Sequence, residues 1–236
     1  KLMCMRLSRL LFIAILFSVF DGLGQIRCGL DGYDTHKETT EQFEEWLSNH
    51  HKNALTLFNS PGQTKEIIQI PVVFHVIHRG EDLGIGSNVS DEKIIEQLSI
   101  LNEDFRRLNS DQTLTPLEFL DVAADTEVTF VLAKQDNEGL PTEGITRQQG
   151  TQNTYKFSEG DILYAENYWP AENYLNIYIA ELEGYLGWAS FPFSDLEGIV
   201  EVNNDRLLDG AAVDYHWLGV NENTGSFNSY GRTLTH

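Results

Sequence analysis

The sequence is poor in cysteine and in basic residues. It holds two cysteines, and 36 acidic residues outnumber 16 basic ones, for a net charge of −20. Such a surface repels nucleic acid and anionic lipid, so neither is expected as a partner. Its carboxylates suit Ca²⁺, although solubility in an extracellular medium explains the charge equally well. Internal repeats and low-complexity tracts are also absent, and 41% hydrophobic residues are ordinary for a globular protein.

An apolar run long enough to cross a membrane is also missing near the N-terminus. The run at 10–20 has eleven residues, whereas crossing the hydrocarbon layer takes about 20. Basic residues precede this run, and 22–24 follow it with the small-x-small pattern of a signal-peptidase site, cleaved before Gln25. We therefore expect residues 1–24 to be a signal peptide, the product to be secreted, and no membrane attachment after cleavage.

Cleavage of that leader removes Cys4 and leaves Cys28 as the single cysteine. No disulfide can then form within the remaining residues. Cys28 stands between Arg27 and Gly29, which suggests a cysteine switch. In such a switch, a thiolate from a propeptide fills the open fourth position of a catalytic zinc ion and keeps an enzyme latent. The alternatives are an unpaired thiol and a thiol that pairs with a cysteine beyond residue 236.

The segment between Cys28 and the first strong strand is consistent with a propeptide. Residues 38–58 carry apolar side chains roughly on one face and predict a helix, which the turn-forming residues at 59–62 would end. We expect a propeptide over residues 25–64, with a cleavable loop at 59–66. An N-terminal extension that packs permanently on the domain is the alternative.

The core of the domain is expected from residue 65 onward. The run at 66–78 is almost continuously apolar in its interior, as in a central strand buried on both faces. His75 and His78 lie three apart on this strand and point to opposite faces, so they cannot converge on one ion. His75 is expected to be a hydrogen-bonded core histidine.

A long helix is expected after Ser90, which can cap it, with Asp91 and Glu92 in its first turn. Spacings of four and three residues predict one apolar stripe, formed by Ile94, Leu98, Leu101, Phe105 and Leu108. Further strands are expected at 127–134, 174–183, 198–202 and 209–218. These elements predict an α/β fold in which one sheet is backed by helices.

The last six residues, GRTLTH, have the form of the entry to a zinc-binding helix. In the motif T-L-T-H-E-x-x-H-x-x-G-x-x-H, histidines four apart share a helix face and bind Zn²⁺. The Glu polarises the metal-bound water, and the Gly lets a third His reach the metal. This resemblance implies that His236 would be the first metal ligand and that the general-base Glu would come directly after it. One histidine does not make a zinc site, so residues 1–236 alone should bind zinc poorly and contain no catalytic residue.

Six blocks in order resemble the pappalysin family of metzincin metalloproteases. They are IPVVFHVIHRG, LNEDFRRLN, TPLEFLDVAADTEVTFVLA, DNEGLPTEGITR, YWPAENYLNIYIAELEGYLGWASFP and GRTLTH, and RCG upstream is similar to the latency motif of that family. The resemblance implies that residues 65–236 are the incomplete N-terminal (upper) subdomain of a catalytic domain. Its twisted mixed sheet would be backed by the helix after Ser90, and its active-site helix would only have begun near Arg232.

The resemblance also implies where a substrate would dock. The strand at 209–218 would be the edge strand of the cleft and would pair with an extended peptide. Its substrate-binding residues would be Ala211, Ala212, Val213, Asp214 and Tyr215.

Two functional hypotheses follow. The first is a secreted zinc metalloendopeptidase, made as a latent zymogen, that acts on protein or peptide substrates with catalytic Zn²⁺ and structural Ca²⁺. The second is a non-catalytic secreted α/β module that kept the upper subdomain for binding. The residues after His236 distinguish them, because Glu-x-x-His there supports the enzyme and a true stop supports the binding module.

Overall fold

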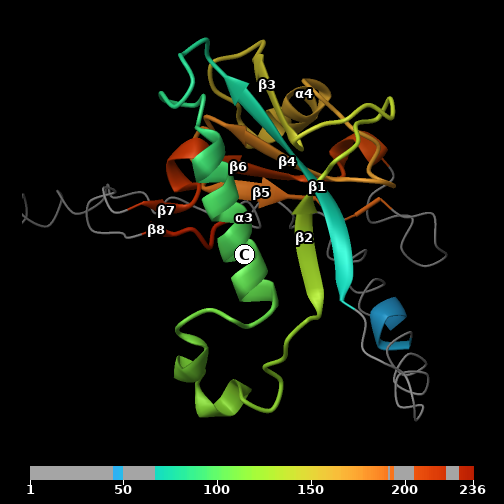
Figure 1. Ribbon diagram of the computed structural model, residues 1–236, viewed down its shortest axis with the longest axis vertical. Coiled ribbons are helices and arrows are strands. Elements are labelled where there is room, and N and C mark those ends of the chain that lie inside the picture. The colour runs from blue at the N-terminus through green and yellow to red at the C-terminus, as the bar shows by residue number, and fades with distance from the viewer. Residues whose placement is uncertain (1–44, 50–66, 191, 194–204, 222–228) are drawn as a thin grey trace, which may run out of the picture.

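The computed structural model describes residues 45–49, 67–190, 192–193, 205–221 and 229–236 (Figure 1). The predicted signal peptide, Cys28, the cleavable loop at 59–66 and the strand expected at 198–202 lie outside these residues. Of the helix expected at 38–58, residues 45–49 are described, and they are helical. No helix within the described residues combines the length and the apolarity needed to cross a membrane.

A mostly parallel, six-stranded sheet organises the domain. Its order is β2-β1-β4-β6-β5, with β3 also paired to β1. Its strands are β1 (Ile68–His78), β2 (Val128–Leu132), β3 (Ile145–Gln149), β4 (Leu175–Ala180), β5 (Gly187–Ala189) and β6 (Ala211–Asp214). Four of them, β1, β2, β4 and β6, lie within the ranges predicted from the sequence. Only β5 is antiparallel to its neighbour. The α/β class expected from the sequence is confirmed.

Strand β1 is the centre of the sheet, as predicted. On one side it pairs with β2 along its first half and with β3 along its second half, while β4 takes the other side. Its residues from Val72 to Ile77 are buried on both faces. A continuous apolar run is what such a strand requires, because both faces of a covered parallel sheet exclude water.

Helix α3 (Asp91–Phe105) lies across one face of the sheet (Figure 1). The Ser90 hydroxyl caps it by accepting a hydrogen bond from the amide of Lys93, as expected. The predicted stripe from Ile94 to Phe105 packs into the main core cluster. Leu108 was wrongly included in that stripe: the helix ends at Phe105, and Leu108 is 64% exposed. Just before it, Arg107 adopts a φ of 51°, a left-handed conformation that stops a helix.

A second core fills the opposite face of the sheet. It contains Tyr155, Tyr178 and Trp188 and is covered by the short helix α4 (Gly160–Ala165). The smaller elements are the 3₁₀ helices η3 (Gln112–Leu114), η4 (Leu117–Phe119), η5 (Phe157–Glu159), η6 (Arg206–Leu208) and η7 (Tyr215–Trp217), and the strand pair β7 (Val220–Asn221) and β8 (Ser229–Tyr230). The sheet is therefore a middle layer between two unequal helical layers.

The outer edge of β2 is closed by a side chain of α3. The amide of Asn102 accepts from the Phe130 backbone N–H at 2.7 Å and donates to the Phe130 carbonyl at 2.9 Å. An unpaired strand edge offers such groups to any other strand, and proteins commonly block it. Asn102 occupies the two groups that a further strand would need at this position.

Candidate functional site: the turn at His236 and the open edge of the sheet

The turn that carries His236 closes with one helical hydrogen bond. The amide of His236 donates to the carbonyl of Arg232 at 3.0 Å, the four-residue span of an α-helix. Within this turn Leu234 packs against the main core cluster, whereas His236 is exposed. A helix beginning near Arg232 was expected from the sequence, and this single turn has the hydrogen bond that would start one.

Ion pairs fasten the turn to the C-terminal end of α3. The Arg232 guanidinium donates both Nη atoms to the Asp111 carboxylate at 2.7 Å, and its Nε lies 3.2 Å from Asp104 Oδ1. The other oxygen of Asp104 accepts from the Thr235 hydroxyl at 2.9 Å. The hydrogen bonds from Arg232 lower the pKa of Asp111 to about 2. Both ends of the turn are thus tied to carboxylates.

Gln97 on α3 holds the segment that leads into the turn. Its side chain is fully buried, its Nε2 donates to the carbonyl of Gly231 at 2.8 Å, and its Oε1 accepts from the amide of Gly219 at 2.7 Å. Gly231 has a φ of 73°, and a Cβ there would lie 2.5 Å from the Ile100 side chain. Only glycine fits this approach, which brings the chain onto α3 immediately before Arg232.

The predicted edge strand is not an edge. β6 lies between β4 and β5, so Ala211, Ala212 and Val213 already pair with neighbours on both sides. Asp214 is buried, and Tyr215 belongs to η7 rather than to a strand. The residues expected to bind substrate through their backbone, Ala211 to Tyr215, therefore lack the open edge that such binding needs. The chain reverses its direction before Gly187, so β5 pairs antiparallel with the side of β6 that was expected to be open.

β5 is the edge strand on this side of the sheet. The Leu186 carbonyl accepts from Asp214, and the Ser190 amide donates to Gly210, at 2.9 and 3.2 Å. In an antiparallel pair, alternate residues face the partner, so Gly187 and Ala189 direct their backbone N–H and C=O groups away from β6. Among the described residues no strand pairs with that outer side.

The turn at His236 lies close to this open edge strand. The Cγ2 atom of Thr233 lies 3.6 Å from the position that a Cβ on Gly187 would occupy. Gly187 itself has no room for a side chain, because a Cβ would come within 2.6 Å of the Ala212 carbonyl oxygen. The structure therefore places the turn that carries the predicted metal ligand close to a strand edge that is unpaired among the described residues.

Metal binding was predicted at His236 and, for the latent form, at Cys28. Within the described residues no group of three or more His, Cys, Asp or Glu side chains could hold a metal ion. Cys28 lies outside those residues. His236 supplies one imidazole donor, and a structural or catalytic zinc site needs three or four. The residues that the structure describes therefore do not form a complete zinc site.

His75 is a structural histidine, as expected. It is fully buried, with Nδ1 2.9 Å from the Thr146 hydroxyl and Nε2 2.9 Å from Asn176 Oδ1. Burial lowers the pKa of His75 to about 4, against the opposing effect of the Asn176 hydrogen bond. His78 does not share these partners, and its Nδ1 accepts from the amide of Gly80 at 3.0 Å.

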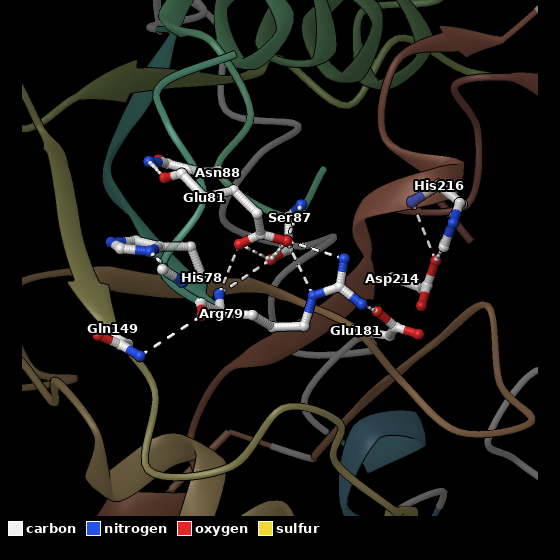
Figure 2. A network of polar contacts seen from close by, with 10 residues as sticks. His78, Arg79, Glu81, Ser87, Asn88, Gln149, Glu181, Asp214 and His216 are labelled. Atoms are coloured by element: carbon white, nitrogen blue, oxygen red, sulfur yellow. Dashed lines mark hydrogen bonds and ion pairs between the residues drawn. The ribbon is translucent and has the colours of Figure 1, made fainter. Parts of the chain in front are cut away.

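Sequence reasoning missed a charged network at the carboxyl ends of the parallel strands (Figure 2). Arg79, directly after β1, forms ion pairs with Glu81 and with Glu181, which follows β4. Burial alone would raise the pKa of Glu81, but hydrogen bonds from backbone amides and from Arg79 lower it to about 2. Ser87 also donates to Glu81 at 3.1 Å. Because two carboxylates satisfy the guanidinium, this network joins strand ends rather than offering an anion site.

Asp214, at the end of β6, is likewise committed to local structure. Its Oδ2 accepts from the amide of Leu182 at 2.8 Å, and its Oδ1 accepts from the amide of His216 at 2.9 Å. The His216 ring also lies 2.8 Å from Oδ1 (Figure 2). A buried aspartate that caps η7 and ties β4 to β6 explains the side chain without a substrate.

Solved structures resemble this chain, whereas no family model and no curated protein matches it. Mirolysin in complex with compound 9 is 35% identical, with a TM-score of 0.63 over 72% of this chain and 61% of that one. Mature mirolysin of Tannerella forsythia in complex with a cleaved peptide is 35% identical, with a TM-score of 0.62 over 75% and 62%. A promirolysin mutant of the same organism is 30% identical, with a TM-score of 0.65 over 89% and 66%.

The chain has a metzincin-like catalytic-domain fold. Mirolysin is a metzincin-type metalloprotease, so the chain is related to that class of hydrolases, and the promirolysin match extends the relation to a zymogen form. The chain spans 61% to 66% of the length of these mirolysin chains. The fold and the relationship are thus established for part of such a protein.

Proposed function

We propose that this chain is the N-terminal part of a secreted zinc metalloendopeptidase of the pappalysin family, made as a latent zymogen. The observation that carries the proposal is an identity of 30% to 35% to mirolysin structures over 72% or more of this chain. Secretion follows from the leader pattern in residues 1–24. The strongly acidic composition supports structural Ca²⁺ in the complete enzyme.

The zymogen part is supported by how much of the chain each mirolysin form matches. The match to mature mirolysin covers 75% of the chain and the match to mirolysin with compound 9 covers 72%, and residues 65–236, the expected catalytic part, make up about 73% of it. The promirolysin match covers 89%. The additional share is close to the size of residues 25–64, which the sequence assigns to a propeptide containing Cys28.

In the complete enzyme His236 would be one of the zinc ligands. The other ligands and the general-base Glu are expected in residues that follow it. When bound, the metal would supply an activated water as the nucleophile for peptide hydrolysis. The residues of this chain would orient the site. Arg232 and Asp104 hold the turn that carries His236, and the packing of Leu234 on the main core cluster keeps this turn against the domain.

Peptide substrates are supported by the open edge of β5. One mirolysin structure contains a cleaved peptide, and an extended peptide binds an exposed strand edge through main-chain hydrogen bonds. The outward backbone groups of Gly187 and Ala189 offer such bonds next to the turn at His236. They take the place of the residues of β6, which the sequence had assigned to this role.

The test uses the full-length gene product that contains this chain. We expect hydrolysis of casein or peptides that phenanthroline abolishes and that serine- and cysteine-directed reagents leave unchanged. His236→Ala should remove both zinc and activity, while His78→Ala, a histidine held by Gly80, should retain both. A full-length product that is active in the presence of phenanthroline would refute the zinc mechanism. A product with neither zinc nor activity would favour the non-catalytic binding module.

Latency has a separate test at Cys28. A zinc-bound thiol is deprotonated, so its block should persist well below the ordinary thiol pKa of about 8.5. Cys28→Ala should give a proenzyme that is active before cleavage or that matures faster. If that variant stays as latent as the parent, the propeptide blocks the cleft by its bulk and the thiol has no part in latency.

A further inference from the structure

Helix α3 contacts the rest of the protein through two faces. Its apolar stripe packs on the sheet. The other face meets residues 219–220 and 231–235. Its residues, spaced by four, three and four along the helix, are Lys93, Gln97, Ile100 and Asp104. The ammonium of Lys93 donates to the Val220 carbonyl at 2.5 Å, and Ile100 lies against Gly231. Such spacing places side chains on one face of a helix, so α3 lies between the core and the segment that ends at His236.

Among the residues of this face, Asp104 makes the contact that is closest along the chain to His236. Its side chain is only 7% exposed. One carboxylate oxygen interacts with Arg232 and the other with Thr235, the residue directly before His236. Charge-assisted hydrogen bonds of this kind are shorter and stronger than neutral ones. Asp104 therefore joins Arg232, at the start of the turn, to Thr235, next to its last residue, through one nearly buried group.

Asp111 holds the same guanidinium but in a different way. Its carboxylate is 40% exposed, so water and salt screen its bidentate pair with Arg232. Within the turn its hydrogen bonds reach Arg232, at the end remote from His236. Asp111 thus anchors the beginning of the turn, whereas Asp104 also fixes its end.

We propose that Asp104 is a positioning residue, which sets the place of His236 relative to the open edge of β5 by holding Thr235 and Arg232. The role in metal binding rests on the proposed function; the role in fixing the turn does not. Partners one step removed from a metal ligand typically change metal affinity by about 10- to 100-fold. Here the step is through the backbone, because Thr235 is covalently joined to the ligand.

The experiment compares Asp104→Ala and Asp104→Asn with Asp125→Asn in the full-length gene product. Asp125 is the matched control, since it forms a similar ion pair with Arg106 at 2.8 Å beyond the end of the same helix. The first measurement is amide hydrogen exchange of residues 231–236 in metal-free protein. The second is zinc affinity, by competition with a chromophoric chelator.

We expect Asp104→Ala to speed exchange of the His236 amide by about tenfold or more and to weaken zinc binding by roughly 10- to 100-fold. Asp104→Asn keeps the size of the side chain and should give smaller changes in the same direction, and it serves if the alanine variant fails to fold. Asp125→Asn should stay within about twofold of the parent in both measurements, the range of a surface pair.

Two results would overturn the proposal. Unchanged exchange at residues 231–236 would show that the backbone and Asp111 hold the turn without Asp104. Faster exchange with unchanged zinc affinity would make Asp104 a purely structural residue. Failure of the proposed function looks different: the parent would bind no zinc, or His236→Ala would leave zinc affinity unchanged. The exchange measurement would then still decide whether Asp104 fixes the turn.

Discussion

Replacing Gln97 with leucine should destabilise the protein more than any ordinary polar-to-apolar exchange. The two side chains are similar in size, and the site is fully buried, so transfer of the side chain alone favours leucine. The amide of Gln97, however, makes hydrogen bonds of 2.7 and 2.8 Å to Gly219 and Gly231. Gln97→Leu would leave one backbone N–H and one carbonyl buried without these partners.

The expected loss follows from that accounting. Each buried polar group that loses its partner costs about 1–3 kcal/mol, so the loss of both bonds should lower the free energy of unfolding by about 2–6 kcal/mol. For a domain of this size, about 1 kcal/mol lowers the melting temperature by roughly 2–4 °C. The melting temperature should therefore fall by roughly 4–24 °C, measured by circular dichroism, with the exposed Gln112→Leu as the control.

Gln97→Glu separates the donor from the acceptor. An ionised carboxylate still accepts from the Gly219 amide, but it cannot donate to the Gly231 carbonyl. Only the protonated acid restores both bonds, so folding should raise the pKa of this Glu above its unfolded value of about 4.3. The deficit relative to the parent should then shrink as the pH falls through the raised pKa. A loss below about 1 kcal/mol for leucine, with no pH dependence for glutamate, would refute the role given to Gln97.

Four further outcomes are expected. Stability should fall as the pH drops from about 6.5 to about 4, because His75 stays neutral in the folded state to a pKa of about 4 while the unfolded chain takes up the proton near 6.5; His75→Gln should flatten this part of a urea-denaturation pH series. Asn102→Ala should cost about 1–3 kcal/mol and increase aggregation seen by light scattering, because it opens the edge of β2 at Phe130. The depressed pKa of Asp111 contributes stability above about pH 4 that is lost as the pH falls toward 2, and acid titration of Asp111→Asn should lack this loss. Residues 1–236 alone should retain no stoichiometric zinc after dialysis and should not hydrolyse casein.

The parts of the fold that were predictable carry long, regular patterns. β1 has eleven residues with an apolar interior, and α3 has a cap, an acidic first turn and an apolar stripe over about three turns. Each pattern follows from burial of one stretch of chain or from local capping, so no knowledge of distant partners is needed. The end of α3 was set too late because Leu108 continues the spacing, whereas the left-handed Arg107 breaks the helix.

The short elements could not be found in this way. β5 has three residues, and β3 has the sequence ITRQQ, in which only the first residue is apolar. Both are strands because they pair with β6 and β1, contacts that depend on how the whole chain folds. Because β5 was not predicted, β6 was expected to be the edge strand, whereas β5 is the outermost strand on that side.

The candidate site likewise contains one residue that a local motif indicates and several that only distant contacts bring there. His236 was found because its motif is local, whereas Gln97, Asp104 and Asp111 contact residues 121 to 134 positions away. One signal for them existed. Gln97 and Asp104 lie seven residues apart on α3, on a face beside the apolar stripe and about a quarter turn from it, where solvent-exposed side chains would otherwise be expected. Asp111 continues the spacing beyond the end of the helix. A polar row at constant helical spacing can therefore indicate a second packed face.

With this second face, α3 contributes to the core, holds the turn that carries His236 and blocks the edge of β2. Its Asn102 closes the edge at β2, while its Asp104 holds the turn beside the edge at β5, which stays open. The edge at β2 is thus blocked at Phe130, whereas the outward backbone groups of Gly187 and Ala189 on β5, near the turn that carries His236, pair with no strand among the described residues. Because one helix carries both Asn102 and Asp104 and also packs on the core, a substitution on α3 is expected to change the stability of the protein and the position of His236 together. The metal-free exchange measurement at His236 is the observation that separates them.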